Sequence, residues 1–311
     1  MKKQAEKSHN RYAIVYPLRL SYGDFWVCVD HLAAALVDAG VNVGDRVCLF
    51  EWNSPEFEIA FNAIVGSGAI VVPLNPMSRE MEIEYVVNDS SAGTMIVRDE
   101  LYPRVRSVLP NTPSVKRVIV IGRRIPHTFS FSWLIKKCPS RPLSVNIDPK
   151  EDLCVLPYTS GTTGMPKGVM LTHYNIVSNL LQASVAFQVH ENDVPLNGTP
   201  FYHIFGMVVG MLMSLYVGAK QVVMKESHRK DFCELVERYK VTYAFLVPPM
   251  IIALIGYPNL PKYDWSSVRF IANGAAPISP EVAKKFQELT GLTVYHQWGL
   301  TEASPVVAAN P

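Results

Sequence analysis

Between residues 158 and 168 the sequence gathers glycines, hydroxyl side chains and a lysine that together could hold a phosphate group. Glycines let a loop bring backbone N–H groups close to an anion. Hydroxyls add short, rotatable donors, and a lysine adds a positive charge that can follow a phosphate during reaction. The sequence therefore predicts a polyphosphate cradle formed by Thr159, Ser160, Gly161, Thr162, Thr163, Gly164 and Lys167.

The same composition is also typical of a flexible surface turn. The neighbours favour the phosphate loop, because the apolar run 153–157 predicts a buried strand before it and residues 172–187 predict a helix after it. Strand, glycine-rich loop and helix is the order in which phosphate loops occur. The pattern is not that of P-loop NTPases, whose lysine precedes a serine or threonine, since Lys167 precedes Gly168.

Two later segments could contact a ligand, although each has an ordinary structural explanation. His203 lies between aromatic residues, where a lone histidine is more often a core group than a catalyst. Gly274, Ala275 and Ala276 follow a predicted strand, and their small size would let a flat ring lie against the backbone. The alternative for these three residues is a plain tight turn before a helix that starts at residue 279.

A third segment combines an aromatic ring, a hydroxyl and a carboxylate. Trp298 could stack on a base, and Thr301 offers a hydroxyl close by in the sequence. Glu302 could hold Mg²⁺, which usually takes one or two protein carboxylates beside phosphate oxygens and water. Alone, Glu302 could equally cap a helix.

The alternating strands and helices predicted on either side of these segments should position them. Alternation of this kind predicts an α/β fold, with layered parallel or mixed sheets flanked by helices. In such sheets ligands bind beyond the carboxyl ends of the strands. The patterns predict helices at 22–39, 55–65, 79–88, 172–187 and 205–219, and strands at 46–50, 69–74, 94–97, 117–121, 153–157, 220–224, 241–246, 268–272 and 292–296.

The organisation into lobes follows from the segment 122–151, which is rich in proline, basic and hydroxyl residues and is typical of a connection. We therefore expect a first α/β lobe over residues 1–150. A second lobe over residues 151–311 should carry the segments that could contact a ligand.

Composition narrows the class of protein. The 311 residues carry a net charge near +2 and no basic tract, which argues against a nucleic-acid partner. The five cysteines form no CxxC pair, as expected of reduced cysteines inside a cell. Residues 1–10 are too polar for a signal peptide, and the apolar run 205–219 is too short to span a bilayer. These observations predict a cytoplasmic protein without a transmembrane segment.

Taken together and in this order, four segments resemble the signature of adenylate-forming enzymes: YTSGTTGMPKG at 158–168, PFYHIFG at 200–206, NGAAP at 273–277 and YHQWGLTE at 295–302. Within that superfamily the chain looks like an acyl-CoA synthetase of the fatty-acid or aryl-acid ligase branch. The resemblance implies most of the N-terminal domain of that fold. It also implies the substrates ATP, CoA and a small-molecule carboxylic acid, with Mg²⁺ as the metal.

The resemblance assigns a role to each segment. The glycine-rich loop would hold the β- and γ-phosphates of ATP, and His203 would lie near the acyl carbonyl. The backbone of Gly274, Ala275 and Ala276 would form the wall beside adenine and the acyl group, with Trp298 against the adenine. Thr301 would contact the α-phosphate, and Glu302 would bind magnesium.

The sequence also departs from the family pattern. The ribose-binding aspartate and the C-terminal domain with its lysine have no counterpart in the 311 residues. We therefore expect little activity from this chain alone. The alternatives are a non-catalytic nucleotide- and acyl-binding subunit that works with a separately encoded C-terminal domain, and a remnant without a ligand. Association as a homodimer also stays open, and medium- or long-chain fatty acids are favoured over aryl acids.

Overall fold

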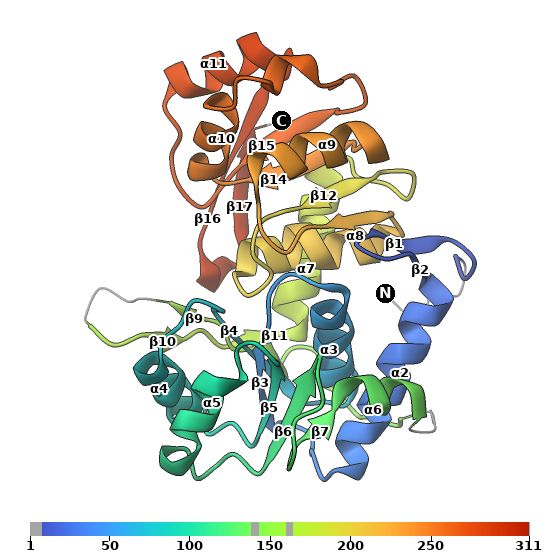
Figure 1. The fold of residues 1–311 in the computed structure, drawn as a ribbon, viewed down its shortest axis with the longest axis vertical. Coiled ribbons are helices and arrows are strands. Elements are labelled where there is room, and N and C mark those ends of the chain that lie inside the picture. The colour runs from blue at the N-terminus through green and yellow to red at the C-terminus, as the bar shows by residue number, and fades with distance from the viewer. Residues whose placement is uncertain (1–7, 138–142, 160–163, 311) are drawn as a thin grey trace. The chain divides into compact units, whose positions relative to one another are not determined.

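The computed structural model describes residues 8–137, 143–159 and 164–310, and Figure 1 labels its helices and strands. The chain divides into two compact units. One consists of residues 24–176 and is called the continuous unit below. The other, called the discontinuous unit, joins residues 1–23 to residues 177–311.

The continuous unit is built on a sheet whose seven described strands run in the order β11-β8-β4-β3-β5-β6-β7. Neighbouring strands are parallel, except that β11 runs antiparallel to β8. The strands are β3 (Arg46–Phe50), β4 (Ile70–Leu74), β5 (Thr94–Arg98), β6 (Arg117–Ile121), β7 (Phe129–Ser130), β8 (Leu153–Val155) and β11 (Leu171–Thr172). A separate hairpin pairs β9 (Tyr158–Thr159) with β10 (Lys167–Gly168).

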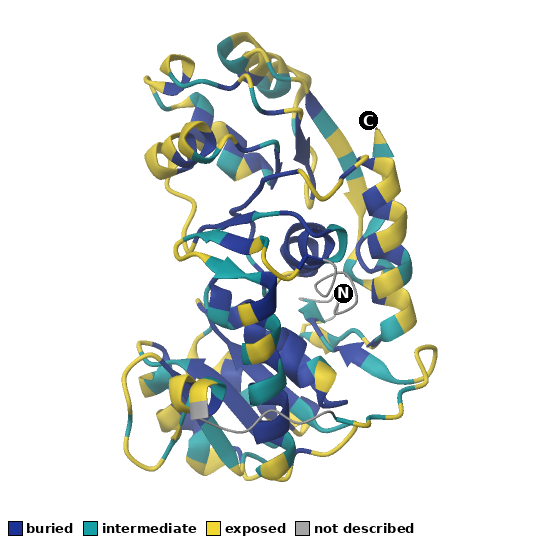
Figure 2. Ribbon diagram, turned by 90° about the vertical axis from the view of Figure 1, so that its right-hand side faces the viewer, coloured by how far each residue is buried: buried dark blue, intermediate teal, exposed yellow. Residues whose placement is uncertain are grey.

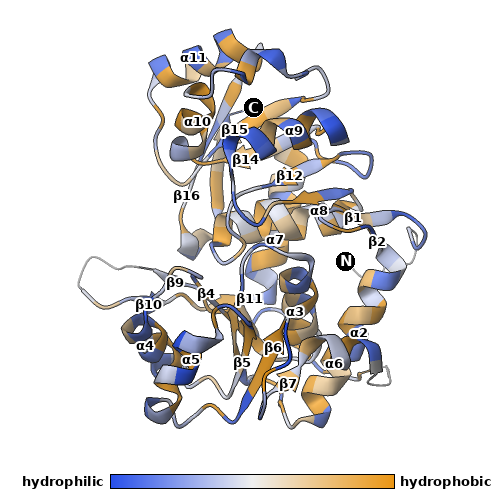
Figure 3. Cartoon of the chain, in the orientation of Figure 1, coloured by the Kyte–Doolittle hydropathy of each residue, from blue (hydrophilic) through white to orange (hydrophobic). Residues whose placement is uncertain are grey.

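Helices cover this sheet because its strands are apolar on both sides, and Figure 3 shows their hydrophobic colouring. On one face α4 and α5 pack against buried strand side chains such as Cys48, Val72 and Met95. The helix α3 begins where the Ser54 hydroxyl accepts a hydrogen bond from the Phe57 N–H at 3.0 Å. The helices are α2 (Tyr22–Asp38), α3 (Pro55–Gly66), α4 (Glu80–Ser90), α5 (Tyr102–Val108), the 3-10 turn η1 (Leu109–Asn111) and α6 (Phe131–Lys137).

The discontinuous unit contains an eight-stranded sheet in the described part of the chain, in the order β17-β16-β15-β14-β12-β13-β1-β2. The strands from β16 to β1 run parallel, and β17 and β2 add antiparallel edges. The strands are β1 (Tyr12–Tyr16), β2 (Leu20–Ser21), β12 (Pro195–Asn197), β13 (Gln221–Val223), β14 (Tyr243–Leu246), β15 (Phe270–Asn273), β16 (Val294–Gly299) and β17 (Val306–Asn310).

The two faces of this second sheet bury different side chains. Buried residues are dark blue in Figure 2. On one face α9, α10 and α11 enclose an apolar core that includes Leu246, Ile271 and Phe286. On the other face Tyr243 stacks on Phe270, with ring centroids 5.1 Å apart. The helices and helical turns are α7 (His173–Ala186), the π-helix η2 (Gly206–Leu212), α8 (Met213–Val217), α9 (Arg229–Tyr239), α10 (Pro248–Ile255), η3 (Leu260–Lys262), α11 (Pro280–Thr290) and η4 (Thr301–Ala303).

The compact units differ from the predicted division into residues 1–150 and 151–311. Residues 151–176 join the continuous unit because β8 pairs with β4. Residues 1–23 join the discontinuous unit because β1 pairs with β13, and the buried Tyr22 hydroxyl donates to the Ala219 carbonyl at 2.8 Å. The segment 122–151, predicted as a connection, contains β7 and α6.

The predicted order of strand, glycine-rich segment and helix is confirmed, because β8 precedes the segment and α7 follows it. The described ends of the segment pair as β9 and β10, and β11 follows before α7 begins at His173. The loop therefore does not open directly into the N-terminus of a helix.

The apolar run 205–219 forms the buried π-helix η2 and the helix α8, so the prediction of a buried helix is confirmed. No helix in the described ranges is long and apolar enough to cross a membrane. The four cysteines that the structure describes are free, and Cys138 lies outside the described residues.

Candidate functional site

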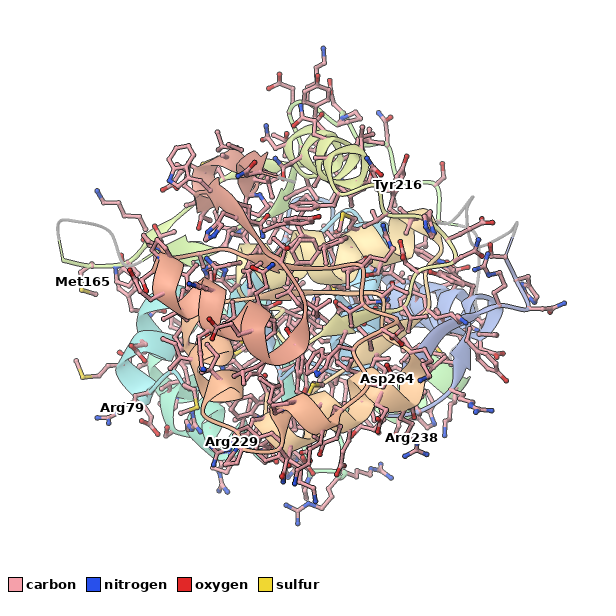
Figure 4. The ribbon with its side chains drawn as sticks, turned by 90° about the horizontal axis from the view of Figure 1, so that it is seen from above. Arg79, Met165, Tyr216, Arg229, Arg238 and Asp264 are labelled. Carbon is pink, nitrogen blue, oxygen red and sulfur yellow. The ribbon has the colours of Figure 1, made fainter. Side chains whose placement is uncertain are left out.

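The predicted phosphate loop lies in the continuous unit, where its two ends pair as a short hairpin. Thr159 in β9 lies opposite Lys167 in β10. Gly164 has φ +115°, in the left-handed region that favours glycine. The Lys167 side chain is exposed, as is its neighbour Met165, which is labelled in Figure 4. The predicted ligands Ser160, Gly161, Thr162 and Thr163 lie outside the described residues.

Two tyrosines fix the base of this hairpin to its surroundings. The Tyr158 hydroxyl donates a hydrogen bond to Asp89 Oδ2 at 2.5 Å, and the Tyr85 hydroxyl donates to the Pro166 carbonyl at 2.8 Å. Burial and the hydrogen bond to Asp89 raise the pKa of Tyr158, so its hydroxyl keeps its proton and stays a donor. The two rings also meet edge to face, 6.5 Å apart. The hairpin base is thereby held against α4.

The other predicted residues gather at one edge of the sheet in the discontinuous unit. The strands β12, β14, β15 and β16 are neighbours and parallel, so their carboxyl ends share that edge. His203 follows β12, the Gly274 segment follows β15, and Thr301 with Glu302 follows β16. This is the position at which open α/β sheets bind ligands.

Gly274 is the point at which these segments touch. A Cβ atom there would lie 2.8 Å from Cζ of Phe205 and 2.9 Å from Nε2 of Gln297. Neither distance is compatible with a side chain at residue 274 unless a neighbour moves. Glycine at this position therefore lets the His203 segment and β16 approach the loop after β15.

The imidazole of His203 is held as a neutral hydrogen-bond donor. Its Nδ1 accepts a hydrogen bond from the Phe205 N–H at 3.2 Å, which places the proton of the neutral ring on Nε2. The ring is exposed, yet the protein packed around it desolvates the charged form and lowers the pKa of His203. His203 can therefore donate from Nε2 to an oxygen near neutral pH.

The backbone that presents His203 is a tight turn into the π-helix. The His203 N–H donates to the Pro200 carbonyl at 3.2 Å, and its carbonyl accepts from the Met207 N–H at 2.9 Å. Gly206 lies against this turn, where a Cβ atom would be 2.7 Å from the Thr199 carbonyl oxygen and would also collide with the Pro200 carbonyl. The turn is thus closed around a residue that cannot carry a side chain.

A pocket of about 520 Å³ lies beside the Gly274 segment, within the discontinuous unit. Ala275 has φ +65°, which is uncommon for a residue with a Cβ and turns the segment toward β16. The Trp298 side chain is 63% exposed, so one of its faces is available for stacking. The lining residues are Asn273, Ala275, Ala276, Pro277, His296, Gln297, Trp298, Gly299, Ala308, Ala309 and Asn310.

Thr301 and Glu302 form the short turn η4 directly after β16. The Leu300 N–H donates to the Pro305 carbonyl at 3.0 Å, which closes the turn. Glu302 is exposed. Within residues 8–137, 143–159 and 164–310, no group of three or more His, Cys, Asp or Glu side chains could hold a metal. A single exposed carboxylate still fits Mg²⁺, whose other ligands are commonly phosphate oxygens and water.

Sequence reasoning missed Gln297, whose side-chain amide is buried beside Gly274. Neither Nε2 nor Oε1 has a hydrogen-bond partner among the described residues. A buried polar group left in that state costs about 1–3 kcal/mol. The predicted strand stopped at residue 296, whereas β16 continues to Gly299, so the alternation that directs this amide inward was not visible.

Comparison with known proteins identifies the family of the chain. Residues 1–311 match the family model described as AMP-binding enzyme. The chain is 31% identical to a long-chain-fatty-acid–CoA ligase of Bacillus subtilis, with 95% of this chain and 58% of that protein aligned. It is 33% identical to a 4-coumarate–CoA ligase of Humulus lupulus, over 93% of this chain and 54% of that protein.

A solved structure shares the fold. The crystal structure of a long-chain-fatty-acid–CoA ligase from Archaeoglobus fulgidus superposes with a TM-score of 0.92 at 32% identity, over 99% of this chain and 65% of that one. This chain spans about half the length of the curated relatives it matches. It belongs to the AMP-binding enzyme family.

Proposed function

We propose that the chain provides the nucleotide- and acid-binding part of an acyl-CoA ligase that activates a carboxylic acid with ATP. The observation that carries the proposal is the pocket lined by Ala275, Ala276 and Trp298, at the carboxyl ends of parallel strands and next to the segment of a neutral histidine. The resemblance to adenylate-forming enzymes implies the same residues for the adenylate site. The relatives are CoA ligases for long-chain fatty acids and for 4-coumarate.

The proposed reaction has two steps. A carboxylate oxygen of the acid attacks the α-phosphorus of ATP, the bond to the β-phosphate oxygen breaks, and pyrophosphate leaves. The thiol of CoA then attacks the acyl carbonyl and loses its proton, and AMP leaves with the electrons of the cleaved bond. We infer a medium- or long-chain fatty acid as the substrate.

The residues have separate tasks in this proposal. Trp298 stacks on the adenine against the backbone of Gly274, Ala275 and Ala276. His203 donates from Nε2 to an oxygen of the acid or of the adenylate, which stabilises the negative charge as it moves from carboxylate to phosphate. Thr301 donates to the α-phosphate.

The phosphate-binding tasks complete the proposal. Glu302 would hold Mg²⁺, which neutralises phosphate charge when it is bound. The hairpin loop from Thr159 to Lys167 would hold the β- and γ-phosphates.

Isotope exchange between pyrophosphate and ATP tests the first step directly. The purified chain should catalyse only slow exchange, and this exchange should require both Mg²⁺ and a carboxylic acid, with octanoate, palmitate and 4-coumarate as the first acids to compare. Binding of ATP and Mg²⁺ without exchange would favour the non-catalytic binding subunit. Failure to bind ATP with Mg²⁺, measured by calorimetry, would overturn the proposal.

A further inference from the structure

The amide of Gln297 borders the pocket of the proposed site, and the proposed function gives it no task. Both of its polar atoms are buried, and neither has a hydrogen-bond partner in the described part of the chain. Its Nε2 and the ring of Phe205 both lie beside Gly274. Buried side-chain amides in folded proteins nearly always have hydrogen-bond partners. The unpaired donor and acceptor of this amide therefore suggest a partner from outside the protein, such as a bound ligand.

The alternation of side chains along β16 indicates which part of the substrate could pair with the Gln297 amide. Successive side chains of a strand point to opposite faces of the sheet, so Gln297 shares a face with Tyr295 and not with Trp298. Tyr295 stacks on Phe270 with ring centroids 5.9 Å apart, on the face that also carries Phe205. The Gln297 side chain therefore projects from the face of the sheet that carries Phe205, whereas the Trp298 side chain projects from the other face, although both border the pocket.

We propose that Gln297 recognises a hydroxyl group on the acid, which makes the substrate a hydroxylated carboxylic acid; this rests on the proposed function of the same site. A hydroxyl donates one hydrogen bond and accepts others, so a single group can pair with Oε1 and Nε2 of the amide. An unsubstituted alkyl chain would leave both atoms without a partner. A site with such a buried amide discriminates against the acid that lacks the hydroxyl.

Non-reacting analogues of the acyl-adenylate test this preference without requiring turnover. Sulfamoyl-adenosine esters of octanoate and of octanoates hydroxylated on the second, third or fourth carbon form one set. The esters of 3-phenylpropanoate and of its ring-hydroxylated form make a second pair. We expect at least one hydroxylated analogue to bind about tenfold more tightly, by calorimetry, than its unsubstituted counterpart.

Two variants assign this preference to the amide. Gln297→Leu has similar size and no polar atoms, so it should abolish or reverse the tenfold preference. Gln287→Leu makes the same chemical change at an exposed position of α11 and should leave the preference unchanged.

The outcomes separate this inference from the proposed function. Equal binding of every hydroxylated and unsubstituted analogue by the native chain would overturn the inference alone, and would indicate that water satisfies the amide. A preference that survives in Gln297→Leu would overturn it as well. If no analogue binds the native chain, the proposed function and this inference both fail.

Discussion

At the scale of single residues, the adenine side of the proposed site depends on an exposed indole. The Trp298 side chain is 63% exposed although it is large and apolar, and it borders the pocket beside Ala275 and Ala276. An exposed tryptophan at a pocket mouth loses solvent contact when a flat ring stacks on it. The free energy of that stacking should therefore appear in nucleotide affinity.

Replacing Trp298 with alanine should weaken the binding of AMP by about 1–3 kcal/mol, the usual value of stacking between a base and an aromatic side chain. Calorimetry with AMP measures the change. Trp133→Ala is the matched control, because Trp133 is similarly exposed at 57% and lies in α6 of the other unit. Equal AMP affinity of the native chain and Trp298→Ala would contradict the assignment.

The protonation of His203 gives a second prediction at this scale. Desolvation by the protein packed around the ring lowers the pKa of His203, and the Phe205 N–H already occupies Nδ1, so the ring should take up a proton only below the ordinary histidine pKa of about 6.5. Because the folded state disfavours the proton, His203 reduces stability as the pH falls below that value. An NMR titration of the histidine side chains should place the His203 midpoint below 6.5.

His203→Asn identifies the signal in that titration. A midpoint above 6.5 for the missing resonance would show that the ring is stabilised as a cation. A protonated His203 could not accept the hydrogen bond from the Phe205 N–H at Nδ1.

At the scale of elements, the His203 turn depends on the absence of a side chain at Gly206. Gly206→Ala would push a methyl group into the Thr199 and Pro200 carbonyls. Such overpacking costs about 1–3 kcal/mol of unfolding free energy. Urea unfolding of the variant measures it. The same change should also weaken acid-dependent exchange, because the His203 ring moves with the turn.

Gly66→Ala is the control for that substitution. Gly66 ends α3, and a Cβ there would lie 3.9 Å from the Ala33 side chain, which is an ordinary contact. This variant should be neutral or more stable by up to about 1 kcal/mol, since alanine favours a helix over glycine. Similar losses in both variants would contradict the steric explanation.

Longer elements with a clear hydrophobic period could be predicted from the sequence. The bounds of β3 and β6 agree with the predicted strands at 46–50 and 117–121, and α3 differs from the predicted helix by one residue at its end. Burial of both faces makes these strands continuous apolar runs, and Ser54 with Pro55 marks the start of α3.

Shorter elements could not be predicted, because a strand of two residues shows no period. This applies to β7, β9, β10 and β11, and it explains why the pairing of β9 with β10 was not predicted. The positions of the site residues at strand ends followed from the sequence. The contacts of Gly274 with Phe205 and Gln297 did not, because they join segments that are far apart in the chain.

At the scale of the whole molecule, one compact unit is formed by a continuous stretch of sequence and the other by two separate stretches. All strands of the continuous unit come from one stretch of sequence. The discontinuous unit needs residues 1–23, which place β1 between β13 and β2. One unit is therefore complete within a single segment of chain, whereas the other requires both ends of the sequence.

A segment of residues 24–176 should consequently fold by itself, with helical and strand signals in circular dichroism and a cooperative urea transition. Residues 177–311 alone should be less stable than in the full chain, because they lack β1 and the hydrogen bond from Tyr22 to Ala219. An unfolded 24–176 segment would show that its sheet depends on the rest of the chain.

The strand β16 has a consequence for engineering this protein. Its odd-numbered positions, Tyr295 and Gln297, project from one face of the sheet, and its even-numbered positions, His296 and Trp298, project from the other; we propose that Gln297 contacts the acid and Trp298 the adenine. A library that varies only odd positions should alter the choice of acid while AMP affinity is preserved. Deletion of one residue N-terminal to Tyr295 would shift the strand register and move each side chain to the opposite face of the sheet. Selectivity for the acid and affinity for AMP should then be lost together.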